Sequence, residues 1–250
     1  MLNCHSIGGG VPLVLLHAIG LDHESWRDVQ EALAPGHRVI AVDQRGHGGS
    51  PGVVGEPSLA DYADDTARLI ESLDLGPVIV VGLSFGGMIA QHLTIRRPDL
   101  VSRLVLCGCP GRFPDDIRPA LAARGEDARR GGMGGVVEPT LERWFTPEFL
   151  ASGGAERVRR RLLSDDVSGW AAGWRAISNH DAQEALMGVG CETLCVAGAL
   201  DKATPPAMVR ALADAIPRAR YAEIPGAPHI MHLERHDAFV RVIGDFVDKG

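Results

Sequence analysis

Short runs of apolar residues alternate along this chain with segments whose apolar residues recur every three or four positions. A continuous apolar run is typical of a strand that is buried on both faces, and the spaced pattern is typical of a helix. Runs of the first kind predict strands at residues 13–16, 38–43, 77–82, 104–107 and 193–197, and a further short strand is expected at 219–224. Because helical patterns separate these runs, we expect a parallel sheet with helices on both faces.

Three helices carry signals at their ends or along one face. Apolar residues in 59–73 recur at helical spacing, and Ser58 with Asp61 predicts a capping box at the first turn. Residues 239–247 carry a similar apolar stripe. Residues 204–206 (Thr-Pro-Pro) predict the start of another helix, because proline is tolerated where a backbone N–H would be unpaired anyway.

The alternation breaks between about Arg112 and Met187, in a stretch rich in Arg, Gly and Ala that shows no strand pattern. Helices are predicted within it at about 115–130, 137–145, 155–164 and 168–178. We therefore expect an α/β core made of residues 1–111 and 188–250, with residues 112–187 inserted as a helical cap that shapes a substrate pocket.

The composition fits one globular unit of 250 residues with 45% hydrophobic residues and a net charge of −7. This acidic balance argues against a nucleic-acid partner, because phosphate backbones bind clustered Lys and Arg. No apolar run approaches the roughly 20 residues that span a bilayer, and the N-terminus lacks a secretory signal. We expect a cytoplasmic protein without a membrane partner; the pattern carries no signal of oligomeric state.

Cysteine usage supports the same compartment. The five cysteines are odd in number and show no CxxC spacing. We expect small buried thiols in a reducing cytoplasm, with Cys107 and Cys109 on one face of a strand, rather than disulfides or a zinc site.

The sequence Gly82-Leu83-Ser84-Phe85-Gly86 matches the pattern G-x-S-x-G and directly follows a predicted strand. An apolar-faced helical segment begins just after it. A turn of this kind holds the serine in a strained backbone conformation with its hydroxyl above the sheet, and the flanking residues must be small. Ser84 is therefore the expected nucleophile.

A serine hydroxyl needs a base, and the base needs an acid that orients it. In this architecture the order along the chain is Ser, then Asp or Glu, then His. Asp201 follows the strand at 193–197 and His229 follows the strand at 219–224, so both lie at the carboxyl edge of the sheet. His232 and His236 compete with His229, but they fall in or near the last helix, so His229 is preferred.

Acyl transfer also needs hydrogen-bond donors for the developing oxyanion. One expected donor is the backbone N–H of Phe85, directly after the nucleophile. The second is expected in the loop after the strand at 13–16, at Ile19 or, failing that, at Ala18. We expect the His17 ring to brace this loop through local hydrogen bonds.

Two glycine-rich segments are expected to be structural. Residues 131–135 follow no strand, so we interpret them as a turn between helices rather than a phosphate-binding loop. Residues 43–50 leave a strand, and we expect a turn that packs near Ser84. A metal site at Asp43 and His47 is the less favoured alternative, so no metal site is predicted.

These motifs resemble those of the α/β-hydrolase superfamily over nearly the whole chain. The resemblance rests on residues 17–20, 43–50 and 82–87 together with Asp201 and His229. It implies the α/β-hydrolase fold, a mostly parallel sheet of about seven strands with helices on both faces and a helical cap. The family's first strand is expected to be missing, because only one strand fits before residue 13.

Within this superfamily, the cap is similar to that of the 3-oxoadipate enol-lactonases. The similar segments are residues 129–149, residues 197–206, and Trp174 with Ile177 and Asp181. The resemblance implies hydrolysis of 3-oxoadipate enol-lactone to 3-oxoadipate in aromatic catabolism, through an acyl-enzyme and without metal or organic cofactor.

The cap is also expected to supply a cation for a carboxylate-bearing substrate. Arg143 is the expected clamp and Trp144 a wall beside it, because guanidinium grips a carboxylate with two parallel hydrogen bonds. Arg112 and Arg175 are weaker candidates. One departure from the family is Ala18, which stands where a glycine is usual and would adopt a positive φ less easily.

Three alternatives stay open. The first is a general carboxylesterase of the same fold, and the second is a cofactor-independent perhydrolase with the same three side chains. The third is a non-catalytic protein that uses the scaffold to bind a ligand. In the enzymatic interpretations the partner is a small-molecule ester or lactone.

Overall fold

The computed structural model describes residues 1–248, in which seven strands form one sheet. The strand order is β1-β3-β2-β4-β5-β6-β7; β1 is antiparallel to β3, and the other neighbours are parallel. A single strand precedes residue 13, as the sequence predicts. The strands are β1 (Cys4–Gly8), β2 (Val11–Leu16), β3 (His37–Val42), β4 (Val78–Leu83), β5 (Val101–Cys107), β6 (Glu192–Gly198) and β7 (Ala219–Ile224).

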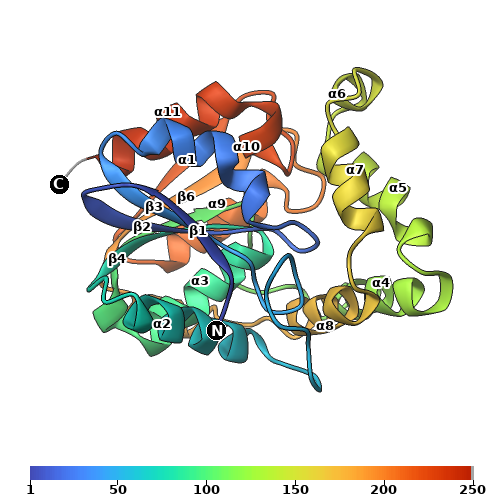
Figure 1. The fold of residues 1–250 in the computed structure, drawn as a ribbon, viewed down its shortest axis with the longest axis horizontal. Helices are drawn as coiled ribbons and strands as arrows, with labels where there is room; N and C mark the ends of the chain where they lie inside the picture. The colour runs from blue at the N-terminus through green and yellow to red at the C-terminus, as the bar shows by residue number, and fades with distance from the viewer. Residues whose placement is uncertain (249–250) are drawn as a thin grey trace.

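Helices cover both faces of this sheet. Figure 1 shows α1 and α11 on one face and α2 and α3 on the other. The helices outside the inserted segment are α1 (Arg27–Leu33), α2 (Leu59–Ser72), α3 (Phe85–Arg96), α9 (Pro206–Ala215), α10 (Met231–Glu234) and α11 (His236–Val247), with short 3-10 turns at His23–Trp26 and Pro98–Leu100. A further 3-10 turn, Ala185–Gly188, ends the inserted segment. The predicted capping box at Ser58 and Asp61 is present at the start of α2. The predicted fold class is confirmed.

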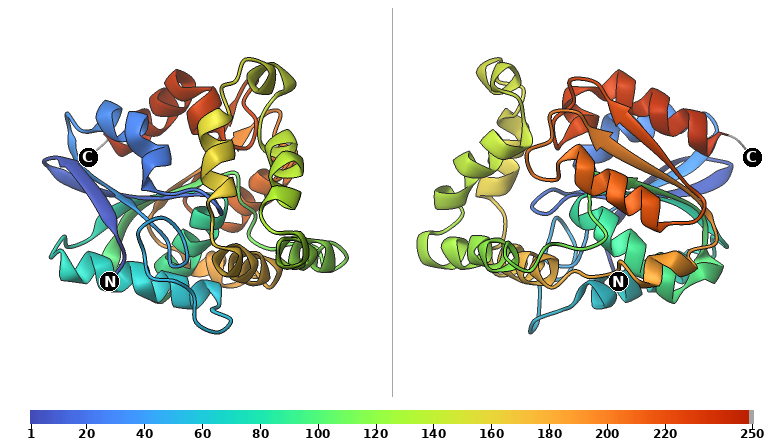
Figure 2. Two further views of the ribbon diagram at one scale, coloured as in Figure 1. Left: turned by 45° about the vertical axis from the view of Figure 1, so that its right-hand side comes forward. Right: turned by 180° about the vertical axis from the view of Figure 1, so that it is seen from behind.

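Five helices lie between β5 and β6 and stand to one side of the sheet in the right-hand view of Figure 2. They are α4 (Arg118–Gly131), α5 (Gly134–Trp144), α6 (Pro147–Ala151), α7 (Glu156–Leu163) and α8 (Val167–Ser178), and we call them the cap helices. An isolated β-bridge between Arg112 and Asp181 joins the two ends of this insertion.

Two details of the insertion differ from the prediction. The short helix α6 was not predicted; it is capped by the Thr146 hydroxyl, which accepts from the N–H of Phe149. The glycine-rich turn is also shorter than residues 131–135, because Gly131 still belongs to α4 and Gly134 to α5.

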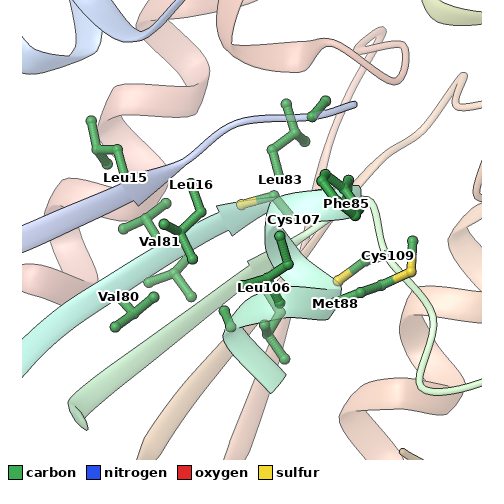
Figure 3. Packing of buried hydrophobic residues seen from close by; sticks show 14 of the residues in the cluster. Leu15, Leu16, Val80, Val81, Leu83, Phe85, Met88, Leu106, Cys107 and Cys109 are labelled. Atoms are coloured by element: carbon green, nitrogen blue, oxygen red, sulfur yellow. The ribbon is translucent and has the colours of Figure 1, made fainter. Parts of the chain in front are cut away.

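The apolar runs of the central strands are buried on both sides. Every residue of β4 is buried, because β2 and β5 flank it in the sheet and helices cover both faces. Figure 3 shows side chains of β2, β4 and β5 packed beneath the turn that leads into α3, with Phe85 and Met88 beside them. This packing gives the residues that follow β4 a rigid base.

The cysteine expectation is correct in part. All five thiols are free, but Cys4 and Cys191 are only partly buried. The strand β5 ends at Cys107, and Gly108 turns the backbone with φ +52°, so Cys109 lies beyond the strand. The expected placement of Cys107 and Cys109 on one strand face is therefore wrong. Among residues 1–248, no helix is long and apolar enough to cross a bilayer.

Candidate active site

Ser84 occupies the turn between β4 and α3. Its backbone has φ +54° and ψ −113°, a conformation that L-residues rarely adopt. Its N–H donates to the carbonyl of Cys107 at 2.8 Å, which ties the turn to the end of β5. A methyl group at Gly86 would lie 2.1 Å from the carbonyl oxygen of Leu16, and one at Gly82 would lie 2.4 Å from that of Gly86. The two glycines of the motif are therefore required by close backbone contact.

Asp201 and His229 form a hydrogen-bonded pair at the ends of β6 and β7. Nδ1 of His229 lies 2.8 Å from Oδ2 of Asp201. The other carboxylate oxygen accepts from the N–H groups of Ala203 and Thr204, each at 2.8 Å. With Nδ1 donating to the carboxylate, Nε2 of His229 is left as a proton acceptor.

The structure brings these side chains to one edge of the sheet. They follow β4, β6 and β7, and Gly108 at the end of β5 lies between them. A methyl group at Gly108 would lie 3.3 Å from Oδ2 of Asp201 and 3.4 Å from Nδ1 of His229. The residue before Gly108 is Cys107, whose carbonyl accepts the hydrogen bond from the N–H of Ser84. Within residues 1–248, no hydrogen bond joins the hydroxyl of Ser84, which is 7% exposed, to the His229 ring. Catalytic hydrogen bonds are often long before substrate binds.

Of the competing histidines, His232 is buried and His236 is partly buried. His232 packs its ring 4.3 Å from that of Trp26, and burial lowers the pKa of His232 to about 3. His236 is the first residue of α11. His229 has a carboxylate partner, Asp201, whereas within residues 1–248 neither His232 nor His236 has one. The structure therefore favours His229 over the other two histidines as the base.

The predicted oxyanion loop lies directly against the turn at Ser84. The N–H of Gly86 donates to the carbonyl of His17 at 3.1 Å, and Ile19 and Phe85 are both buried. The N–H of Ile19 has no acceptor among residues 1–248. Ala18 does not need a positive φ, because Gly20 makes the turn with φ +73°. The expected strain at Ala18 is therefore absent.

His17 braces this loop as the sequence predicts. Its Nδ1 donates to the carbonyl of Ala18 at 2.8 Å, and the N–H of Gln44 donates to its Nε2 at 2.9 Å. Burial, with the nearby His47, lowers the pKa of His17 to about 3, so the ring is neutral and keeps both bonds.

The segment after β3 is held by the carboxylate of Asp43. Its oxygens accept from Asn3, from the backbone and ring of His23, and from the N–H of Gly49. Burial alone would raise the pKa of Asp43, but these hydrogen bonds outweigh it and lower the pKa. The ring of His47 lies 5.9 Å from that of Phe85. The segment thus packs beside the turn at Ser84.

The cap helices place an aromatic residue over this edge, with a cation next to it in sequence. Trp144 ends α5, its ring centroid lies 6.2 Å from that of His229, and its carbonyl accepts from the N–H of Ile230. Arg143 precedes it and is half-buried. The weaker candidates already face carboxylates, since Arg112 lies 3.6 Å from Asp115 and Arg175 lies 3.8 Å from Glu56.

Arg124 and Gly173 are two residues of the cap helices that the sequence did not single out. Arg124 on α4 places its guanidinium carbon 4.5 Å from the ring centroid of Trp174 on α8. The neighbouring Gly173 packs against the side chains of Ile19 and Phe85. Nothing in the local pattern separates Arg124 from the other arginines of the cap, because its position depends on how α4 packs against α8.

Comparison with known proteins gives the family. The model of the alpha/beta hydrolase fold matches residues 11–236. A pimeloyl-[acyl-carrier protein] methyl ester esterase from Chromobacterium violaceum is 32% identical over 250 residues, covering 97% of this chain and 96% of its own. An (E)-2-((N-methylformamido)methylene)succinate hydrolase from Acinetobacter baylyi is 31% identical over 196 residues (78% and 74%). The 3-oxoadipate enol-lactonase 1 of the same organism is 25% identical over 237 residues (94% and 88%).

Solved structures agree with this fold. The enol-lactonase from Burkholderia xenovorans LB400 has a TM-score of 0.93 and 29% identity, covering 99% of this chain and 96% of its own. A thermophilic esterase from Thermogutta terrifontis, with malate bound, has a TM-score of 0.93 and 28% identity (99% and 93%). The resemblance seen in the sequence is confirmed: this chain belongs to the α/β-hydrolase family.

Proposed function

We propose that this protein is a serine hydrolase of carboxylic esters or lactones in which Ser84, Asp201 and His229 are the catalytic residues. The observation that carries the proposal is the buried hydrogen bond between His229 and Asp201, at the same sheet edge as the strained turn of Ser84. A strained serine beside an oriented imidazole is the arrangement that activates an alcohol as a nucleophile.

The reaction runs in two steps. In the first, Oγ of Ser84 attacks the carbonyl carbon while Nε2 of His229 takes its proton, and collapse of the tetrahedral intermediate breaks the acyl–oxygen bond as His229 gives that proton to the leaving oxygen. In the second, His229 takes a proton from water, which attacks the acyl-enzyme, and returns it to Oγ of Ser84 as the acid is released. Asp201 keeps the imidazole in one tautomer and stabilises its cation. The proton transfers in both steps use only these side chains and water.

The developing oxyanion is assigned to the backbone N–H groups of Phe85 and Ile19. Both residues are buried, and the loop is tied to the turn by the bond from Gly86 to His17. Fixed donors in a site that excludes water stabilise the negative charge without reorganisation, and loss of one typically costs about 3 kcal/mol of barrier.

The substrate that we favour is 3-oxoadipate enol-lactone, with residues 112–187 acting as the cap over it. Several similar proteins carry small carboxylates in their names: an enol-lactonase of 3-oxoadipate, a hydrolase of a substituted succinate, and an esterase with bound malate. Opening the lactone expels an enolate, which leaves readily and becomes a ketone. We assign the substrate carboxylate to Arg143 and the wall of the pocket to Trp144, whose ring lies near His229.

A general carboxylesterase is the second candidate, and the similarity to a methyl ester esterase favours it. The two candidates differ in the charge of the preferred acyl group. An enol-lactonase should prefer an anionic lactone, whereas an esterase with an apolar pocket should prefer neutral p-nitrophenyl esters.

Labelling with a fluorophosphonate tests the shared chemistry. We expect the wild type to be labelled at Ser84, Ser84→Ala to resist, and the control Ser102→Ala, which changes an exposed serine on β5, to behave as wild type. A wild type that resists the probe would contradict the proposal. Rates on 3-oxoadipate enol-lactone and on p-nitrophenyl butyrate then decide between the two substrate classes.

A further inference from the structure

Arg124 is a half-buried cation without a carboxylate. Its guanidinium lies over the ring of Trp174, and within residues 1–248 no Asp or Glu lies within salt-bridge distance of it. A buried guanidinium stacked on an indole keeps its planar face covered and its N–H donors available at the edge.

Arg143 is the second such cation. The half-buried arginines of the insertion are Arg118, Arg124, Arg143, Arg159 and Arg161. Three of them contact carboxylates: Arg118 with Asp115, Arg159 with Glu156, and Arg161 with Asp165. Among the described residues, Arg124 and Arg143 alone in this set have no acidic partner.

Each of these arginines is next to a tryptophan of the cap, Arg124 by stacking and Arg143 in sequence. Trp174, under Arg124, follows Gly173, which packs against Ile19 and Phe85. Trp144, beside Arg143, lies 6.2 Å from the His229 ring. Trp174 therefore links Arg124 to the oxyanion side of the site, and α5 carries Arg143 next to a residue that lies near His229.

The two arginines come from neighbouring helices of the cap. The helices α4 and α5 pack together, and α4 is joined to α8 by a hydrogen bond from Nε1 of Trp170 to the carbonyl of Arg124, at 3.3 Å. Burial lowers the pKa of Arg124 to about 10, and the charge of Arg143 adds to this shift. Two unpaired like charges held together are unfavourable, and a bound anion relieves the repulsion.

We propose that Arg124 and Arg143 together bind the carboxylate of an anionic acyl substrate, with Trp174 as the platform that holds Arg124 in place. The proposal rests on the hydrolase function above and adds Arg124 to it as a specificity-determining residue. The indole Nε1 of Trp174 is buried without a hydrogen-bond partner among residues 1–248, so it supplies a further donor in the same region.

A pair of substrates that differ only in charge tests this. The probes are p-nitrophenyl hemisuccinate and its methyl ester, and release of p-nitrophenol reports cleavage of the same bond in both. For Arg124→Met we expect KM for the hemisuccinate to rise about tenfold or more, because charge-assisted hydrogen bonds to the carboxylate are lost. KM for the methyl ester should change less than about twofold, and kcat should stay near the wild-type value for both.

The control is Arg130→Met on the same helix, where the exposed guanidinium pairs with Asp127. It should leave both substrates unchanged. Arg143→Met should resemble Arg124→Met, and the double variant should lose less than the product of the two single losses, because both groups bind one carboxylate.

Several results would overturn the proposal. One is an Arg124→Met variant that changes both substrates equally, as a purely structural role would, or changes neither. Another is a wild type with a higher kcat/KM for the methyl ester than for the hemisuccinate. If the wild type cleaves neither ester and resists the fluorophosphonate, the hydrolase function fails instead. In that case the anion site is tested by measuring the dissociation constant of glutarate for the wild type and for Arg124→Met by calorimetry. Equal dissociation constants would refute the anion site.

Discussion

Nδ1 of His229 lies 2.8 Å from Oδ2 of Asp201, and these side chains are 2% and 0% exposed. The second oxygen of Asp201 is bound by the N–H groups of Ala203 and Thr204. The carboxylate is thus fixed from the backbone on one side and fixes the imidazole on the other. This arrangement decides which tautomer of His229 faces the substrate.

Replacing Asp201 by Asn should remove activity without unfolding the protein. The amide oxygen keeps the bonds from Ala203 and Thr204, so its NH₂ group faces Nδ1 of His229 and selects the tautomer with a proton on Nε2. That tautomer cannot take the proton of Ser84. We expect kcat to fall about a thousandfold or more, with the midpoint of thermal unfolding within a few degrees of wild type. Unchanged kcat would contradict the role of Asp201.

Gly108→Ala should disturb the site by direct contact. Its methyl group would lie 3.3 Å from Oδ2 of Asp201 and 3.4 Å from Nδ1 of His229, so the pair must shift by a few tenths of an ångström. We expect kcat to fall about tenfold or more, since small displacements of reacting groups are costly. Gly76→Ala is the matched control, because Gly76 also has a positive φ but nothing within 4 Å. Equal losses of activity in the two variants would refute this explanation.

Ser84→Gly should be more stable than Ser84→Ala, although both should be inactive. The backbone at Ser84 has φ +54°, which glycine adopts freely and alanine does not. We expect a difference of about 1–2 kcal/mol in the free energy of unfolding, measured by urea denaturation. Asp74→Gly, at φ +49°, should show a gain against Asp74→Ala in the same direction. No difference at Ser84 would mean that the turn stores no strain.

The buried histidines should make the protein less stable in mild acid. Burial lowers the pKa of His17, His180 and His232 to about 3, against 6.5 without burial. Between these values the unfolded chain binds more protons than the folded one, so the free energy of unfolding falls as pH drops below about 6.5. No such loss is expected above that pH.

The variant His232→Phe tests this dependence. It removes one titrating group and keeps an aromatic ring against Trp26. The loss of stability between pH 7 and pH 5 should shrink by about 1–2 kcal/mol, as read from urea unfolding at the two pH values. An undiminished loss would show that His232 does not contribute to it.

The sequence by itself determined the fold class and the positions of Ser84, Asp201 and His229. Strand and helix periods are local properties, and each of these residues lies in the turn or loop that follows a predicted strand. Because parallel strands end at one edge of a sheet, residues far apart in sequence are brought to the same place by connectivity alone. The His229–Asp201 bond is the structural counterpart of that inference.

The tertiary structure alone decided what surrounds these residues. The short helix α6 and the end of β5 at Cys107 depend on caps and a backbone turn that no apolar period marks. The sequence singled out Arg143 but not Arg124, because the stacking of Arg124 on Trp174 arises only when α4 packs against α8. Periodicity shows which face of a helix is buried, but not which helix covers it; that is decided by contacts between segments distant in the chain.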